Sequence, residues 1–154
     1  MTLPFDDLDR RILNALQEDA SRTNNELAAA VHASPATCLR RVKRLTDEGV
    51  IQRQVALVAP EKLGAGLTAI VEITLDHQAA ERMQEFEELV AKEREVLQCY
   101  RVSPGPDFVL IVQVADMPAY HAFAHRVFAA HANVRNVRSF FSVHRSKFET
   151  RIAV

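Results

Sequence analysis

The chain has 154 residues, of which 48% are hydrophobic, and its formal net charge is −1. This hydrophobic content is enough to bury a core, which excludes an intrinsically disordered chain. It contains no run of about 18 apolar residues, and its N-terminal segment turns acidic within six residues. We therefore expect no membrane span and no secretory leader, but a cytoplasmic globular protein with Cys38 and Cys99 as reduced thiols.

The first helix is expected over residues 7–18. Asp6 is a suitable N-cap, because its side chain can accept a hydrogen bond from the first turn. Acidic residues at positions 7 and 9 suit the positive end of the helix dipole. The apolar side chains that recur at helical spacing are Leu8, Ile12, Ala15 and Leu16.

Two further helices follow closely. The stretch Thr23-Asn24-Asn25-Glu26 matches a capping box. It opens a short helix whose inward face is expected to contain Leu27, Ala30 and Val31. Ser34 can cap a third helix, Pro35 suits its first position, and Gly49 suits its C-terminal end. A helix, a short helix, a tight turn and a helix make the pattern of a helix-turn-helix unit.

Positive charge is concentrated on the third helix. Residues 34–45 contain four basic side chains and no acid, although residues 1–62 carry nine of each sign. At 100° per residue, Cys38, Val42 and Leu45 form a buried stripe. Small side chains with basic ones behind them, on the opposite face, would let the helix enter a DNA major groove. The residues expected to contact DNA are Ser34, Pro35, Ala36, Thr37, Arg40, Lys43 and Arg44.

Roles within this set follow from side-chain chemistry. We expect Thr37 and Arg40 to reach base edges, and Ser34, Lys43 and Arg44 to contact phosphates. Arg41 lies beside the buried stripe and is expected to pair with an acid of the first helix. Two alternatives remain: the basic face is only a solvated surface, or the helix-turn-helix makes protein contacts alone. The two capped helices and the short turn before the third helix favour DNA binding.

A strand-containing linker over residues 51–66 is expected to separate the DNA-binding domain, 1–50, from a second domain, 67–154. Strands are predicted over residues 50–58 within this linker and over 67–75, 96–102, 107–115 and 133–145 beyond it. Helices are predicted over 78–94 and 118–131. The order βαββαβ predicts a ferredoxin-like fold of the α+β class, with two helices on one face of a four-stranded antiparallel sheet.

The predicted strand over residues 107–115 is apolar on both sides. The face of the sheet that carries no helices should therefore not be left in water. A second copy of the chain would cover it, so we expect a homodimer.

This organisation resembles the Lrp/AsnC (feast/famine) family of transcription regulators over nearly the whole chain. The most specific part of the resemblance is the stretch SPATCLRRVKRLTDEGVI, which is close to the family's recognition-helix pattern. The resemblance implies a homo-oligomer that binds double-stranded DNA, with dimers assembling into octamers. It also implies a small-molecule effector, an amino acid or a related metabolite, and no cofactor.

In this family the effector lies between subunits of the βαββαβ domain. Carried over to this chain, its contacts are Ser103, Pro104, Gly105, Pro106, Asp107 and Ser139. The loop departs from the usual pattern, because the prolines at positions 104 and 106 remove two backbone N–H donors. A ligand carboxylate that needs those donors would lose them, so the effector is expected to be either atypical or absent.

Two other functions are weighed against this one. A metal-responsive regulator would use His121 and His125, four residues apart, with His131 or His144, but a zinc site needs about three protein ligands. The first two histidines are expected on a flank of their helix or in solvent, so no metal is expected. Siroheme decarboxylases share the architecture but carry a basic, histidine-containing run after the linker strand. Here that region reads ALVAPEKLG, so no enzyme is expected.

Overall fold

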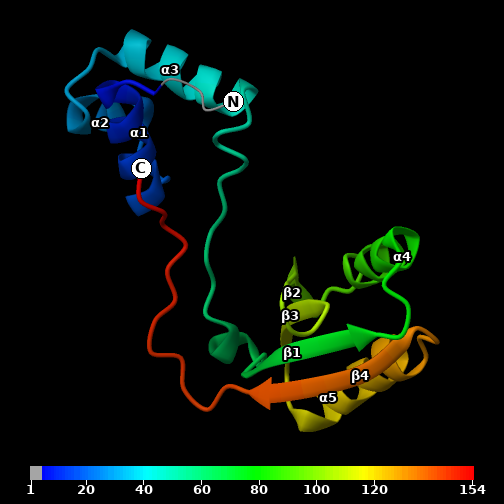
Figure 1. Ribbon diagram of the computed structural model, residues 1–154. Helices are drawn as coiled ribbons and strands as arrows, with labels where there is room; N and C mark the ends of the chain where they lie inside the picture. Colours follow the sequence, from blue (N-terminus) through cyan, green and yellow to red (C-terminus); the bar gives the residue numbers. More distant parts are fainter. Residues whose placement is uncertain (1–4) are drawn as a thin grey trace. The chain divides into compact units, whose positions relative to one another are not determined.

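The computed structural model describes residues 5–154, which divide into two units (Figure 1). The first comprises residues 5–57 and 147–154, and the second comprises residues 58–146. The sequence pattern assigned residues 67–154 to one domain. The structure instead groups 147–154 with the first unit, because these residues bind its first helix.

Three helices build the first unit: α1 (Asp7–Glu18), α2 (Asn24–Ala30) and α3 (Pro35–Asp47). The expected caps are confirmed at Asp6 for α1, in the capping box of α2 and at Ser34 for α3, and Asp9 completes a second capping box at α1 that was not predicted. In the turn between α2 and α3, His32 has a left-handed backbone with φ of 55°. Histidine adopts this conformation more readily than bulkier residues, which allows the tight turn without a glycine.

The core of the first unit lies where the three helices meet. Its buried side chains are Ile12, Leu13, Ala15, Leu27, Ala28, Val31, Cys38 and Leu45. The expected inward position of Ala30 is wrong, because this side chain is exposed and Ala28 is buried in its place. On a helix, positions 27, 28 and 31 share one face, and position 30 lies about 100° away from its centre.

The linker contains no strand, contrary to the prediction for residues 50–58. A strand needs a neighbour to receive its backbone hydrogen bonds, and nothing in the described part of this single chain pairs with the segment. The side chains of Val55, Leu57 and Val58 are all exposed. A short 3₁₀ turn, Pro60–Leu63, then leads into the second unit.

The second unit contains β1 (Leu67–Leu75), α4 (Ala80–Val90), β2 (Val96–Arg101), β3 (Phe108–Val114), α5 (Met117–Ala124) and β4 (Val134–Phe141). All the strand pairs are antiparallel, in the order β2-β3-β1-β4. The predicted βαββαβ order is therefore confirmed. The last helix ends earlier than expected and continues as a π turn over His125–Ala129.

The two faces of this sheet differ. Alternate residues of β1 and β3, such as Val71 and Leu110, are fully buried against α4 and α5. The opposite face carries no helix within the described residues. Its apolar side chains are Ile70, Tyr100, Val109, Ile111 and Phe140, which lie on neighbouring strands. The strand β3 is thus apolar on both sides, as the sequence indicated.

Candidate nucleic-acid interface and effector site

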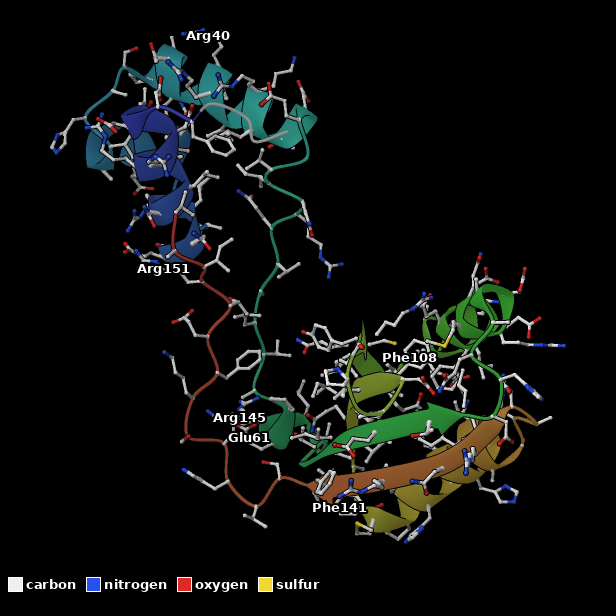
Figure 2. The ribbon with its side chains drawn as sticks, viewed as in Figure 1. Arg40, Glu61, Phe108, Phe141, Arg145 and Arg151 are labelled. Carbon is white, nitrogen blue, oxygen red and sulfur yellow. The ribbon has the colours of Figure 1, made fainter. Side chains whose placement is uncertain are left out.

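The outward face of α3 is open to solvent. Ser34, Pro35, Ala36, Arg40 and Lys43 are exposed, and Thr37 is half-buried. Arg40 points away from the other helices of its unit (Figure 2). Within residues 5–154, neither Arg40 nor Lys43 forms an ion pair. Both cations are therefore available to an anionic partner.

The start of α3 is held by side-chain hydrogen bonds. The Ser34 hydroxyl accepts from the Thr37 N–H at 3.2 Å and donates to the Thr37 hydroxyl at 2.9 Å. Asn24 Nδ2, at the start of α2, donates to the Pro35 carbonyl at 2.9 Å. Sequence reasoning missed this role of Asn24, since nothing in a capping-box pattern points to a partner on the next helix.

A buried carboxylate joins α1 to α3. Asp9 is fully buried, and its two oxygens lie 3.1 Å from Arg41 Nη1 and 2.6 Å from Arg44 Nη2. Burying a carboxylate without a cation would be costly, so this contact fixes how the two helices pack. The expected pairing of Arg41 with an acid of the first helix is confirmed.

Arg44 differs from its expected orientation. It was assigned to the outward face, but one nitrogen of its guanidinium is used by Asp9, and the side chain is only 39% exposed. A helical wheel gives the direction of the Cβ atom, whereas a long side chain can fold back over the helix. The outward charge is therefore carried mainly by Arg40 and Lys43.

The pKa of Asp6, which lies next to the Asp9–Arg41 ion pair, is shifted. Asp6 accepts a hydrogen bond from the Asp9 N–H and lies 2.7 Å from Arg41 Nη1. The N–H, first, and the Arg41 side chain, second, hold the pKa of Asp6 below its ordinary value of 3.8. The same contact raises the pKa of Arg41. Asp6 therefore stays ionised and caps α1 at the positive end of its dipole.

One apolar side chain accompanies the basic ones. Leu39, beside Arg40 on α3, is 60% exposed. Sequence reasoning did not single it out. The signal was its place between the buried stripe and the basic face, where a leucine has no core to fill. An exposed leucine at this position is suited to contact a thymine methyl group.

The expected effector loop is fastened to the end of β1. Asp107 Oδ2 accepts a hydrogen bond from the Leu75 N–H at 2.7 Å and one from Gln78 Nε2 at 3.4 Å. Ser103, Pro104 and Gly105 are exposed, and Pro106 is half-buried. The carboxylate of Asp107 thus holds the loop, while the tip of the loop is free to meet a ligand.

Ser139 lies apart from this loop within one chain. It is paired with Val71 on β1, and its hydroxyl is hydrogen-bonded to the hydroxyl of Tyr120 on α5. Strand β1 lies between β3, which follows the loop, and β4, which carries Ser139. Burial raises the pKa of Tyr120. The six expected effector residues are therefore not brought together by a single copy, and Tyr120 is a partner that sequence reasoning missed.

A cavity of about 250 Å³ opens elsewhere in the second unit. Its polar lining consists of Glu61, Thr68, Gln113, Ser142, His144 and Arg145. None of the expected effector residues contributes to it.

The structure does not support the metal-responsive alternative among residues 5–154. No three His, Cys, Asp or Glu side chains converge there to hold an ion. His121 and His125 are exposed, as expected. His131 Nδ1 accepts a hydrogen bond from the Asn133 N–H at 3.3 Å, and its ring packs edge-on against Phe86. No helix in this described part has the length and apolar character needed to cross a bilayer.

A capped helix-turn-helix with an outward basic helix, followed by an α+β unit, defines a DNA-binding regulator with a sensory domain. Models of known families agree. Residues 5–52 match a winged helix-turn-helix DNA-binding domain, and residues 68–152 match the Lrp/AsnC ligand-binding domain. The chain belongs to the Lrp/AsnC family of transcription regulators.

Individual relatives agree with this assignment. An HTH-type transcriptional regulator of Haemophilus influenzae is 40% identical, covering 96% of this chain and 88% of its own length. The DNA-binding transcriptional activator DecR of Escherichia coli is 36% identical, covering 97% of this chain and 99% of its own length. A transcriptional regulator of Neisseria meningitidis, solved in complex with L-Met, is 33% identical, with a TM-score of 0.91 over 97% and 96% of the two chains.

Proposed function

We propose that the outward face of α3 is the DNA-recognition surface of this regulator. The proposal rests on a difference between two pairs of basic residues on α3. Arg41 and Arg44 are bound by the buried Asp9, whereas Arg40 and Lys43 are exposed and face away from the core. Arg40 and Thr37 would reach base edges, with Leu39 against a thymine methyl. Ser34 and Lys43 would contact phosphates, while Pro35 and Ala36 permit close approach.

Arg44 has a different proposed role. Its guanidinium lies 2.6 Å from Asp9 and 3.9 Å from Glu48, so it supports the recognition helix and contacts phosphate only with the part that remains exposed. In this proposal Arg44 is a positioning residue.

We further propose that the protein works as a homodimer. The apolar side chains on the open face of the sheet would be covered by the same face of a second copy. Two recognition helices would then read two half-sites about one helical turn, or a multiple of it, apart. Assembly of dimers into octamers is proposed from the family resemblance alone.

The proposed effector is an amino acid or a related metabolite. The relative solved with L-Met supports this class of ligand. Because the loop 103–107 and Ser139 are separated by β1 in one chain, we propose that the site is completed by residues of two copies. The prolines at 104 and 106 leave fewer N–H donors for the ligand carboxylate, so Ser103 and Gly105 are the proposed donors.

A regulator of this kind acts by binding and needs no catalytic step, so we propose that the chain is not an enzyme. We propose that it works in the cytoplasm, where the DNA of a bacterial or archaeal cell lies.

The test is a footprinting titration on the DNA upstream of the gene that encodes the protein. Protection of a defined region, at concentrations far below those that cover random DNA, is the expected result. Arg40→Ala should abolish that protection, whereas Arg135→Ala, which removes an exposed charge from the second unit, should leave it unchanged. Equal protection of random DNA by the parent protein would contradict the proposal.

Effector binding is tested by thermal unfolding with L-Met, L-Leu and other amino acids added one at a time. A ligand that binds only the folded protein raises the melting temperature in a concentration-dependent way. No shift with any amino acid at millimolar concentration would remove this class of effector.

A further inference from the structure

The chain returns to α1 after the second unit is complete. Arg151 Nη1 lies 2.8 Å from Glu18 Oε1, and its Nη2 lies 3.4 Å from Asn14 Oδ1. The Gln17 side chain binds the backbone of Ile152 twice. The Ile152 N–H donates to Gln17 Oε1 at 2.9 Å, and Gln17 Nε2 donates to the Ile152 carbonyl at 3.1 Å. The Gln17 amide thus pairs with both the N–H and the carbonyl of Ile152, as the backbone of a neighbouring strand would.

The end of this segment reaches the core of the first unit. Val154 packs against the cluster that contains Ile12 and Leu13. In Figure 1 the last residues lie against α1. A cavity of about 360 Å³ remains beside Asn14 and residues 149–154. The contact is therefore made by a few polar pairs and one apolar anchor, and not by continuous close packing.

The segment leaves the recognition surface free. Its hydrogen bonds and its ion pair go to the C-terminal half of α1, at Asn14, Gln17 and Glu18. These contacts are made by Arg151 and Ile152, and none of them goes to the outward face of α3, so these two residues do not cover the DNA-binding side chains.

The contact between residues 147–154 and α1 changes how the two units are connected, because of the path that the chain takes. The chain leaves the first unit after residue 57 and returns to it at residue 147. When residues 147–154 are bound to α1, two chain segments connect the DNA-binding unit to the ligand-binding unit. When they are released, only the linker connects the two units.

We propose that α1 carries a docking site for residues 147–154 of the same chain, and that this docked segment is a releasable second connection between the two units. Glu18 and Gln17 are the recognition residues, and Arg151 with the backbone of Ile152 is what they bind. A DNA-binding unit held at two points samples less space than one held by a single linker.

This restriction matters for a dimer on DNA. A second helix-turn-helix that is confined near the first has a higher effective concentration at the second half-site. Release of the segment should therefore weaken binding to two half-sites but not to one. This consequence rests on the DNA-binding function proposed above, whereas the docking itself does not.

Hydrogen exchange of the full-length protein tests the docking. We expect the Ile152 amide to exchange at least about fivefold more slowly in the parent protein than in Arg151→Glu, the effect of one modest hydrogen bond. Glu18→Arg should lose the protection too, and the double variant with both charges exchanged should regain it. Lys147→Glu is the matched control, because it reverses a charge in the same segment that forms no ion pair with α1 among the described residues.

Two results would overturn the docking. One is an Ile152 amide that exchanges at the unprotected rate in the parent protein. The other is protection that disappears on dilution together with the dimer, since that would assign the docked segment to a second copy. Protection of the amides in β1 and β3 shows that each variant is folded.

DNA titrations test the connection. Arg151→Glu should bind a duplex with two half-sites about tenfold more weakly than the parent protein, should bind one half-site equally well, and should be rescued by Glu18→Arg. Equal loss on both duplexes, or no loss on either, would overturn the connecting role. Failure of the parent protein to bind either duplex would refute the DNA-binding function instead, and the exchange experiment would still decide the docking.

Discussion

Asp9 links helices α1 and α3 of the DNA-binding unit. Its carboxylate has no access to solvent and is bound by two guanidinium groups of α3. The arginines keep part of their exposure, at 21% and 39% of the side chain. The pair therefore acts as a partly buried ionic link, in which the carboxylate bears most of the desolvation.

We predict that Asp9→Ala lowers the free energy of unfolding of the first unit by about 3 kcal/mol, because two cations lose their shared partner. Urea unfolding followed by the helical circular-dichroism signal measures this change. Asp7→Ala removes an exposed charge from the same turn and should cost less than about 1 kcal/mol. Equal costs for the two variants would show that the buried link contributes nothing of its own.

Asp6 makes the same unit sensitive to acid. Because its pKa in the folded protein lies below 3.8, its ionised form stabilises the fold above that pH, and this contribution is lost as the pH falls further. Asp6→Asn keeps a capping oxygen but not the charge. We predict that the parent protein has the higher melting temperature at pH 7 and that the difference shrinks as the pH falls below 3.8. A difference that stays constant with pH would contradict this assignment.

At the scale of elements, the end of α3 depends on one glycine. Gly49 has φ of 73°, and its N–H donates to the Thr46 carbonyl at 3.0 Å. The next N–H, of Val50, donates to the Leu45 carbonyl at 2.9 Å. These two bonds form a Schellman motif, which needs a left-handed residue where the helix stops.

Gly49→Ala should therefore destabilise the first unit by about 1 kcal/mol, although an added Cβ meets no neighbouring atom within 4 Å. Differential scanning calorimetry would show this as a lower transition temperature. Gly66→Ala is the control, because Gly66 also has open space but lacks the left-handed backbone. A stabilised Gly49→Ala variant would mean that α3 does not end in this motif.

The elements that were predicted correctly are those with a local cause. Helix α1 begins and ends where its cap and apolar spacing indicated, and the alternation in β1 and β3 identified the buried face of the sheet. The linker strand was wrong because a strand also needs a partner, which a local pattern does not supply. The docking of residues 147–154 could not be foreseen, since it depends on single polar pairs between positions about 135 residues apart.

In the candidate site, too, some residues were predicted correctly and others were not. The exposed positions of Arg40 and Lys43 follow from helix geometry and were predicted. The capture of Arg44 by Asp9 depends on how two helices pack and on a flexible side chain, so it was not. The effector residues came from resemblance alone, and within one copy β1 separates the loop 103–107 from Ser139, which is why the proposed site uses two copies.

At the scale of the whole molecule, the proposed homodimer rests on the open face of the sheet. Phe140 is 45% exposed and paired with Ile70, which in turn is paired with Ile111. Arg138 lies over the Phe140 ring at 5.3 Å and pairs with Glu72 at 3.2 Å. Apolar side chains that surround an ion pair on one open face are consistent with the proposed dimer interface.

We predict that Phe140→Asp converts the dimer to monomers. Burying a phenylalanine contributes at least about 1.5 kcal/mol, and a two-fold interface contains the substitution twice, so the dimer should weaken roughly a hundredfold. Sedimentation velocity across a concentration series measures this. Met117→Asp, on an exposed residue at the start of α5, should leave the dimer intact. A Phe140→Asp protein that stays dimeric would place the interface elsewhere.

The central claim, that α3 holds DNA through its outward basic residues, is tested most directly by the salt dependence of DNA binding. The footprinted duplex should be titrated with the parent protein, Lys43→Ala and Arg135→Ala at several salt concentrations. Each lost phosphate contact reduces the slope of log affinity against log salt by about 1, so Lys43→Ala should reduce the dimer's slope by about 2. Arg135→Ala should leave the slope unchanged. An equal slope for the parent protein and Lys43→Ala would show that the outward face of α3 does not lie on the DNA.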